Sequence, residues 1–524
     1  MQSHGTNKRI LWVDDEIDQL QAHILFLNEK GYDVVQATNG ADAVALVRES
    51  DYDLVLLDEM MPGKDGLTTL EEIKDLKPNL PVVMVTKSEE EHLMEEAIGK
   101  KINDYLTKPV NPSQILSVTK KILEAKKIMG DHLTQRYIKD FNRLSIMLSG
   151  PMNWKDWMDL ALILAKRDLE IENFPDLGLK QTLYGQNKEC NSEFARYIER
   201  NYPQWMRSDD RPNLSVDIVR KYLAPLLIDD LAPVVFVIID CMRIDQWLVI
   251  EELLAEYFNI TKDLYFSVLP TATPFSRNAI FSGLFPEDFV KLMPEAWKQG
   301  GDEESSRNKF ERQFLEKQLL RLKLKLRSEP KYIKIVDLAE GENLLKKLDN
   351  YLNAPLLSVV YNFIDILAHG RSESEILQEI APDEAAFRSL MKSWFLHSPL
   401  YTVLRELSAR QCSVLITTDH GSILGTRGTP AYGRRDTSTN LRYKYGDNLN
   451  CDSKHAILLK DPGTYRLPHF TGHTTYILAK EDYYFIYPTK FNEYQRYFQN
   501  SFQHGGISIQ EMILPVAILK PKRA

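Results

Sequence analysis

Six side chains in the C-terminal part of the chain have the types and spacing of metal ligands. They are three aspartates and three histidines: Asp240, Asp365, His369, Asp419, His420 and His504. Most of them stand at the end of an apolar run, or in the loop after it, and a mixed set of carboxylates and imidazoles suits Zn²⁺ or Mn²⁺. Any one of them alone is more often an ordinary core or loop residue. Six are too many for one tetrahedral ion and fit two, a pair that can clamp both oxygens of a phosphoryl transfer.

A hydroxyl nucleophile is useful between two such ions, because a metal lowers the pKa of the hydroxyl and makes a separate base unnecessary. The segment "SVLPTATPFSRNAIFSG" offers Thr271 and Thr273 as candidates. The residue types do not decide between them.

A second set of polar residues lies in the first 125 residues, again at the ends of apolar runs. Asp14, Asp15 and Asp58 would repel one another unless a divalent cation lay among them, and oxygen-only ligation suits Mg²⁺. Asp58 can then attack a phosphoryl donor as a carboxylate nucleophile. We expect Thr86 and Lys108 to hold the phosphoryl oxygens. Tyr105 is expected to rotate when Thr86 moves.

These positions, including the Lys108-Pro109 pair, resemble the signature of response-regulator receiver domains over about residues 8 to 125. The resemblance implies that a sensor histidine kinase supplies the phosphoryl group to Asp58. It also implies that phosphorylation promotes a homodimer through the receiver.

Alternating apolar strands and helical segments must position both sets of residues. The alternation predicts an α/β fold, with a doubly wound parallel sheet in a receiver domain at 1–125. Helical spacing of apolar residues predicts a three-helix bundle as connector at 126–207, with helices over about 154–170 and 190–202. A second, layered α/β domain is expected at 208–524.

The order of the six C-terminal ligands resembles the alkaline phosphatase superfamily, and "SRNAIFSG" and "HGGISIQEMILP" resemble its PglZ branch. The resemblance implies two zinc sites, one formed by Asp365, His369 and His504. The other is formed by Asp240, Asp419 and His420. In the superfamily, the nucleophile stands ten residues before a glycine. Counting back from Gly283 places the nucleophile at Thr273, with Thr271 as the second choice. Receiver, helical connector and PglZ domain together resemble PorX-type response regulators, which are linked to type IX secretion.

A cationic and aromatic stretch follows the Asp419-His420 pair. It contains Tyr432, Tyr443 and Tyr445 among basic residues: Arg427, Arg434, Arg435, Arg442 and Lys444. Such interleaving suits a short phosphodiester with stackable bases, although a solvated surface loop explains it as well. The family resemblance favours a phosphodiesterase acting on cyclic or linear oligonucleotides, with Arg243, Arg277, Arg434 and Arg435 as candidate contacts to the substrate.

The composition excludes several other classes of protein. The net charge of −9 gives no general attraction to nucleic acid, and no basic recognition helix predicts binding to duplex DNA. Four scattered cysteines and no apolar signal or membrane-spanning run indicate a soluble cytoplasmic protein. The alternative function is a metal-stabilised docking module without enzymatic activity, which binds a sigma factor or a secretion component.

Overall fold

The computed structural model describes residues 8–87, 102–229, 232–297, 308–433, 440–489 and 491–522. The chain divides into two compact units, residues 1–136 and 137–524. Each unit is described by itself.

The first unit contains a five-stranded parallel sheet in the order β2-β1-β3-β4-β5. Its apolar strands are buried and helices pack around them, which confirms the predicted doubly wound sheet. The elements are β1 (Lys8–Val13), α1 (Gln21–Glu29), β2 (Tyr32–Ala37), α2 (Gly40–Glu49), β3 (Leu54–Asp58), α3 (Gly66–Leu76), β4 (Val82–Thr86), β5 (Asp104–Thr107) and α5 (Pro112–Leu123).

Three long helices connect this sheet to the second α/β fold: α6 (Ala125–Ser149), α7 (Trp154–Glu172) and α8 (Lys180–Trp205). Asn153 caps α7, because its side chain accepts hydrogen bonds from two backbone N–H groups of the first turn. The helix α8 starts ten residues before the predicted one, since the polar stretch around Gly185 gave little sign of a helix. Within it, Leu183 and Gln186 are buried.

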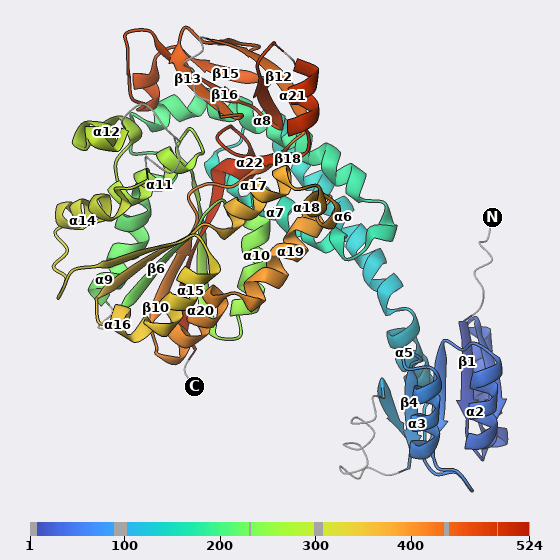
Figure 1. Ribbon diagram of the computed structural model, residues 1–524. Helices are drawn as coiled ribbons and strands as arrows, with labels where there is room; N and C mark the ends of the chain where they lie inside the picture. The colour runs from blue at the N-terminus through green and yellow to red at the C-terminus, as the bar shows by residue number, and fades with distance from the viewer. Residues whose placement is uncertain are drawn as a thin grey trace. The chain divides into compact units, whose positions relative to one another are not determined.

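The second unit is built on a six-stranded sheet in the order β7-β19-β10-β6-β9-β8 (Figure 1). The strands β10, β6, β9 and β8 run parallel, whereas β19 is antiparallel to both of its neighbours. The strands are β6 (Val234–Ile239), β7 (Phe258–Phe266), β8 (Lys331–Ile335), β9 (Leu356–Tyr361), β10 (Ser413–Thr417) and β19 (Ile513–Pro521).

Helices flank this sheet, and smaller sheets lie beyond it, drawn in orange and red at the top of Figure 1. The helices are α9 (Ala224–Asp229), α10 (Ile244–Leu254), α11 (Thr273–Ser282), α12 (Pro286–Leu292), α14 (Glu311–Arg321), α15 (Leu338–Lys346), α16 (Leu348–Leu352), α17 (Phe363–Glu373), α18 (Glu375–Ile380), α19 (Glu384–His397), α20 (Pro399–Ala409), α21 (Phe491–Phe498) and α22 (Ile509–Met512). The smaller strands are β11 (Ile423–Gly425), β12 (Arg427–Tyr432), β13 (Tyr443–Asp447), β14 (Asn450–Cys451), β15 (Ala456–Leu459), β16 (Thr474–Ala479), β17 (Tyr483–Ile486) and β18 (Ser501–Gln503). None of the described helices is both long and apolar enough to cross a membrane.

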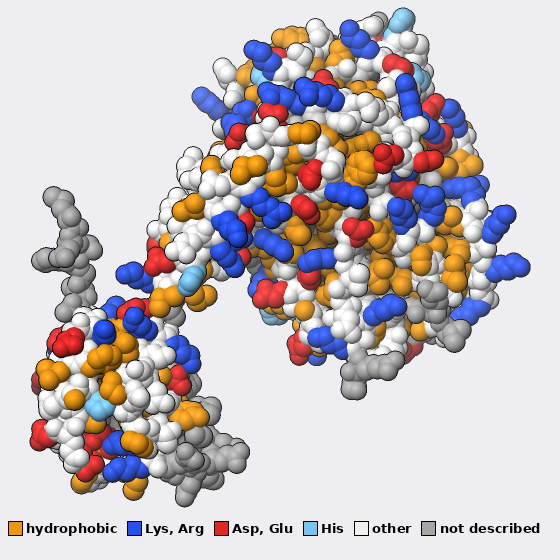
Figure 2. All heavy atoms as spheres, turned by 180° about the vertical axis from the view of Figure 1, so that it is seen from behind, with side chains coloured by type: hydrophobic (Ala, Val, Ile, Leu, Met, Phe, Trp, Pro, Cys, Tyr) orange, Lys and Arg blue, Asp and Glu red, His pale blue; other side chains and the backbone are white. Residues whose placement is uncertain are grey.

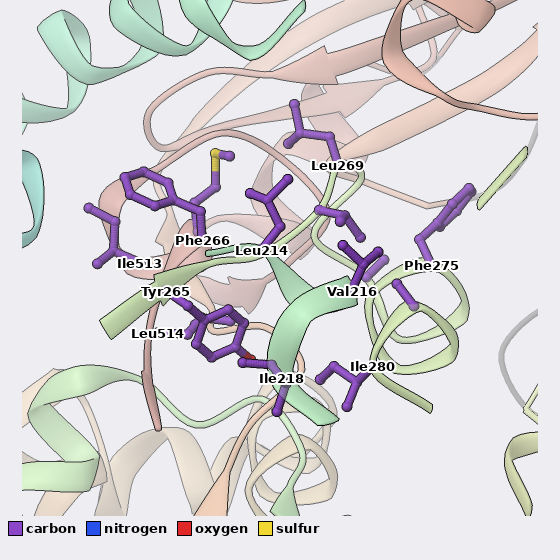
Figure 3. Packing of buried hydrophobic residues seen from close by; sticks show 14 of the residues in the cluster. Leu214, Val216, Ile218, Tyr265, Phe266, Leu269, Phe275, Ile280, Ile513 and Leu514 are labelled. Carbon is purple, nitrogen blue, oxygen red and sulfur yellow. The ribbon is translucent and has the colours of Figure 1, made fainter. Parts of the chain in front are cut away.

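One hydrophobic core joins the connector helices to the second sheet. Figure 3 shows Phe266 and Tyr265 of β7 beside Leu214 and Ile513. From α8, Trp205 packs edge-on against Phe266 with ring centroids 5.2 Å apart. From Tyr137 onward, the connector therefore belongs to the same compact unit as the sheet.

Polar contacts also join α8 to the first turn of α22. The side chain of Asn191 accepts a hydrogen bond from the backbone N–H of Ile509 at 2.8 Å and donates one to Gln510 at 3.1 Å. Asn191 is buried. A connector helix thus helps to hold the chain just after His504.

Candidate metal-dependent active site

The acidic residues of the first unit meet at the carboxyl ends of β1 and β3. Ligand atoms of Asp14, Asp15 and Asp58 all lie within 4.8 Å of one another. The ammonium group of Lys108 lies 2.8 Å from Asp14 and 2.9 Å from Asp58. Burial of the Asp58 carboxyl outweighs the opposing effect of Lys108 and raises its pKa above the usual value. This arrangement can hold a divalent cation beside Asp58.

The other two predicted residues of this set line the same edge. Thr86 is the last residue of β4, and its hydroxyl donates a hydrogen bond to the carboxylate of Glu59, the residue after Asp58. Tyr105 of β5 is 41% exposed. Glu59 was missed from the sequence, because the position directly after a candidate nucleophile carries no signal of its own.

In the second unit, Asp240, Asp419 and His420 form one buried group. Asp240 follows β6, and Asp419 and His420 follow the neighbouring strand β10, so the sheet itself brings them together. The Nε2 atom of His420 lies 3.6 Å from Asp240 and 3.8 Å from Asp419. All three side chains are almost completely buried.

Asp365, His369 and His504 form a second group. Asp365 lies in the first turn of α17 rather than at the end of β9, and His369 lies one turn later on the same helix face. The Oδ1 atom of Asp365 is 3.5 Å from Nε2 of His369 and 3.6 Å from Nε2 of His504. His369 is the exposed member, at 48%.

The two groups are adjacent. The imidazole rings of His420 and His504 stack with centroids 4.2 Å apart and an interplanar angle of 18°. The structure therefore places all six candidate ligands around one small volume, with His369 at the side that faces solvent.

Thr273 and Thr271 have different surroundings. Thr273 is the first residue of α11, and its Oγ1 atom lies 3.0 Å from Nε2 of His420. The hydroxyl of Thr271 instead donates to the carbonyl of Gly506 at 2.8 Å and accepts from the N–H of Gly505 at 3.2 Å. The geometry thus favours Thr273 as the nucleophile and gives Thr271 the role of holding the loop beside His504.

Arg277 contacts the candidate ligands, which differs from its expected contact with substrate. Its guanidinium group donates to Asp240 at 2.7 Å and lies 3.1 Å from Asp419. Glu311 and Asn362 lie on its other side, at 3.4 Å and 3.2 Å. Because Arg277 is completely buried, it positions the two carboxylates and is not free to bind a substrate phosphate.

Arg243 also differs from its expected role, because its donors are used within the protein. It forms ion pairs with Asp245 and Glu384 and is almost completely buried. Arg388 extends this network, since it lies 2.8 Å from Asp245 and also binds carboxylates of α7. Arg243 therefore positions the loop after Asp240.

The predicted cationic stretch is divided among several structural roles. Arg427 is held by Glu481 and Asp482, and Arg442 forms a buried ion pair with Glu511. Lys444 is buried over the ring of Tyr487. Arg434 and Arg435 lie outside the described residues. The described part of this stretch is thus no open cationic surface.

Glu511 was missed from the sequence although it supports the loop that carries His504. Its carboxylate accepts hydrogen bonds from the N–H of Gly506 at 2.9 Å and from the hydroxyl of Ser508 at 2.6 Å. The pattern Ser-x-x-Glu over 508–511 was an available sign of such a cap. Glu311, by contrast, lies in a helix far along the chain and left no sign.

Donor types and protonation in the second unit suit divalent cations. Within the described residues, Oδ1 of Asp240 is buried and accepts no hydrogen bond, which leaves an oxygen available to a cation. Burial lowers the pKa of His420 to about 4, so its imidazole is neutral near pH 7 and can act as a ligand.

The two buried carboxylates beside His420 differ in their charge. Burial opposes ionisation of Asp240, but Arg277, His420 and His504 together outweigh burial, and the pKa of Asp240 lies below its usual value. Burial and the charge of Asp240 raise the pKa of Asp419 well above its usual value. A cation would remove the repulsion that protonates Asp419.

The geometry can now be set beside known families. A family model described as the BREX system PglZ alkaline phosphatase-like domain matches residues 218–519, which is more than half of the chain. The chain belongs to this family. The response regulator receiver domain matches residues 10–120, and the PorX response regulator linker domain matches residues 127–206. Along the chain, the receiver domain, the linker domain and the alkaline phosphatase-like output domain follow one another as in a PorX-type response regulator. A receiver domain implies a phosphoryl donor such as a sensor kinase.

Similar curated proteins share the receiver region. The transcriptional regulatory protein ResD of Bacillus subtilis is 35% identical over 115 residues, which are 22% of this chain and 48% of ResD. The transcriptional regulatory protein PhoP of the same organism is 33% identical over 124 residues, 23% of this chain and 51% of PhoP. The chain thus spans about half the length of these relatives.

Similar solved structures also cover the receiver region. A receiver domain protein from Methanospirillum hungatei is 29% identical, with 23% of this chain and 96% of that chain covered and a TM-score of 0.22. The response regulator TrrA from Thermotoga maritima is 33% identical, with 22% and 99% covered and a TM-score of 0.21.

Proposed function

We propose that this response regulator is phosphorylated on Asp58 and that its output domain is a phosphodiesterase with two zinc ions. The substrates proposed are cyclic or linear oligonucleotides, and the linker match supports a role in regulating type IX secretion. The observation that carries the proposal is the hydroxyl of Thr273, 3.0 Å from His420, whose ring stacks on His504 of the other group of candidate ligands.

In the receiver, an oxygen of Asp58 forms a bond to the phosphorus of a phosphohistidine on a sensor histidine kinase while the P–N bond breaks. The kinase imidazole leaves, and Asp58 carries an acyl phosphate. Lys108, already 2.9 Å from Asp58, contacts the new phosphoryl oxygens. Thr86 donates to them once its hydroxyl leaves Glu59. A Mg²⁺ ion held by Asp14, Asp15 and Asp58 would neutralise the charge that gathers there.

In the output domain, Oγ1 of Thr273 forms a bond to phosphorus while the bond to one ester oxygen breaks, and that oxygen leaves as an alcohol. Water then cleaves the phosphothreonine and restores the hydroxyl. Two divalent cations on the six ligands would stabilise phosphoryl charge and lower the pKa of the hydroxyl. Because Thr273 begins α11, the positive end of the helix dipole also faces the phosphate.

The decisive experiment joins metal analysis to hydrolysis of cyclic and linear oligonucleotides by three variants. Thr273→Val is expected to lower kcat at least about 100-fold, because the nucleophile is lost. Thr273→Ser keeps a hydroxyl and is expected to retain most of the activity. Thr271→Val removes only the contacts with Gly505 and Gly506 and is expected to have a smaller effect.

Two results would contradict this assignment. Parental activity in both valine variants would show that neither threonine is the nucleophile. A zinc-loaded protein that cleaves no phosphodiester, phosphomonoester or sulfate ester would favour the docking module, which binds a sigma factor or a secretion component.

A further inference from the structure

A pocket of about 330 Å³ lies at the end of α11 that is opposite Thr273. Four arginines from separate segments of the chain line it: Arg211, Arg220, Arg321 and Arg466. The fold brings them together from the stretch before β6, from the end of α14 and from the loop after the η6 turn (Pro462–Tyr465).

The arginines are only partly neutralised. Asp217 lies between Arg211 and Arg220, at 2.5 Å and 2.8 Å. Asp288 pairs with Arg466 at 2.5 Å. These are the two carboxylates that line the pocket. Glu287 does not line the pocket but lies 3.7 Å from Arg466, so four guanidinium groups face three carboxylates.

Among the described residues, Arg321 is the lining arginine that forms no ion pair with a carboxylate. Within the described residues, no carboxylate charge acts on it, and its guanidinium group donates to the carbonyl of Ser282 at the end of α11. Burial lowers its pKa below the usual value for arginine, which is the effect of a cation that lacks a counterion. An anion in the pocket would relieve this cost.

The geometry of the arginines is fixed in advance. The guanidinium groups of Arg211 and Arg466 lie 6.0 Å and 5.1 Å from the centroid of the Phe285 ring, so this ring holds both. Each guanidinium group has five N–H donors in a planar fork, and the ion pairs described use only some of them. Arg220, whose side chain is 59% exposed, keeps donors accessible to solvent.

We propose that this pocket binds a phosphate-bearing anion at a site separate from the candidate active site. Planar guanidinium forks suit the oxygens of phosphate, and several of them give a bidentate contact. The length of α11, ten residues or about 15 Å, separates the pocket from Thr273. The anion is either a free nucleotide or a phosphate of an oligonucleotide substrate that lies away from the bond to be cleaved. The second possibility rests on the proposed phosphodiesterase activity.

The first test measures binding of adenosine 5′-monophosphate to the full chain by calorimetry. Arg220→Gln and Arg321→Gln are each expected to weaken one binding event about tenfold or more, and the slope of log affinity against log salt is expected to become shallower. Arg312→Gln is the matched control, because Arg312 lies on the same helix but pairs with Glu316 outside the pocket. Thr273→Val is expected to keep this binding event.

The second test separates the two sources of the anion. If the distal phosphate of a substrate occupies the pocket, both variants raise KM for a tetranucleotide about tenfold and leave kcat and hydrolysis of bis(p-nitrophenyl) phosphate unchanged, because this small diester cannot reach it. If a free nucleotide occupies the pocket, KM for both substrates stays at the parental value while nucleotide binding is lost.

Unchanged nucleotide binding in both Arg220→Gln and Arg321→Gln would overturn the proposal. Arg220→Gln matters here because Arg220 pairs with Asp217, so loss of the Arg321 contact with Ser282 cannot explain its effect. Absence of all hydrolysis would refute the proposed phosphodiesterase, whereas the calorimetry would still decide the role of the pocket.

Discussion

At the scale of single residues, burial sets the chemical state of His420 before any ion binds. Its pKa of about 4 lies below the value of about 6.5 for an exposed imidazole. Between these values the unfolded chain binds a proton that the folded chain does not. The free energy of unfolding of the metal-free protein therefore increases from pH 4 to pH 6.5, by up to about 3 kcal/mol from this residue.

Denaturant unfolding of chelator-treated protein at several pH values in this range checks the prediction. His420→Gln is expected to flatten the dependence on pH, because the group that titrates is gone. His473→Gln is the control, since His473 is exposed and is expected to leave the slope as it is. An equal slope in the parent and in His420→Gln would contradict the buried, neutral imidazole.

Residue types alone pointed to the six candidate ligands, because carboxylates and imidazoles after apolar runs are visible in a sequence. They did not reveal what Arg277 contacts. A sequence does not distinguish a buried arginine from one that binds substrate. Arg277 pairs with Asp240 and Asp419, and these three residues lie on segments that come together only in the folded chain. The same holds for Arg243.

At the scale of elements, an ion network joins the connector helix α7 to the loop after β6. Arg388 of α19 binds Asp168 and Glu172 of α7 and Asp245 of α10, and Asp245 in turn binds Arg243. Arg388 and Arg243 are almost completely buried. Removal of one partner from such a network leaves buried charges without compensation.

Arg388→Met is therefore expected to lower the free energy of unfolding by about 3–5 kcal/mol. Arg410→Met is the matched control, because Arg410 is exposed and pairs with Glu406 and Asp349 at the surface, contacts worth at most about 1 kcal/mol each. Urea unfolding measures both. A loss below about 1 kcal/mol in Arg388→Met would show that the network does not stabilise the fold.

The alternation of strands and helices was readable from the sequence because hydrophobic periodicity is local. The boundaries of elements were less accessible. Asp365 was expected at the end of a strand, but Asn362 ends the apolar run and α17 begins at Phe363, which gives Asp365 and His369 one helix face. The order of strands around β19 was not predicted, since an antiparallel strand at the C-terminal end leaves no periodic sign.

At the scale of the whole molecule, the charges of the output unit bear on what it binds. Figure 2 shows one face on which Lys and Arg side chains are interspersed with Asp and Glu side chains rather than gathered. This face therefore offers no broad basic surface, and the absence of duplex DNA binding stays a prediction. A short anion held in a pocket is a better match to such a distribution.

Phosphorylation of Asp58 is expected to convert the monomer to a homodimer through the receiver domain. Beryllofluoride with Mg²⁺, which imitates the acyl phosphate, is expected to double the mass measured by sedimentation velocity. Asp58→Asn removes the acceptor and is expected to stay monomeric under the same conditions. An unchanged mass of the parent with beryllofluoride would contradict the dimer.

The two hydrogen bonds of Asn191 bear on how such regulators can be recombined. The helix α8 holds the first turn of α22, which follows the loop that carries His504, so an output domain cut free at the end of α8 would lose part of its own support. A chimera with a foreign receiver domain is then expected to keep a stable output domain only if it retains the native connector helices.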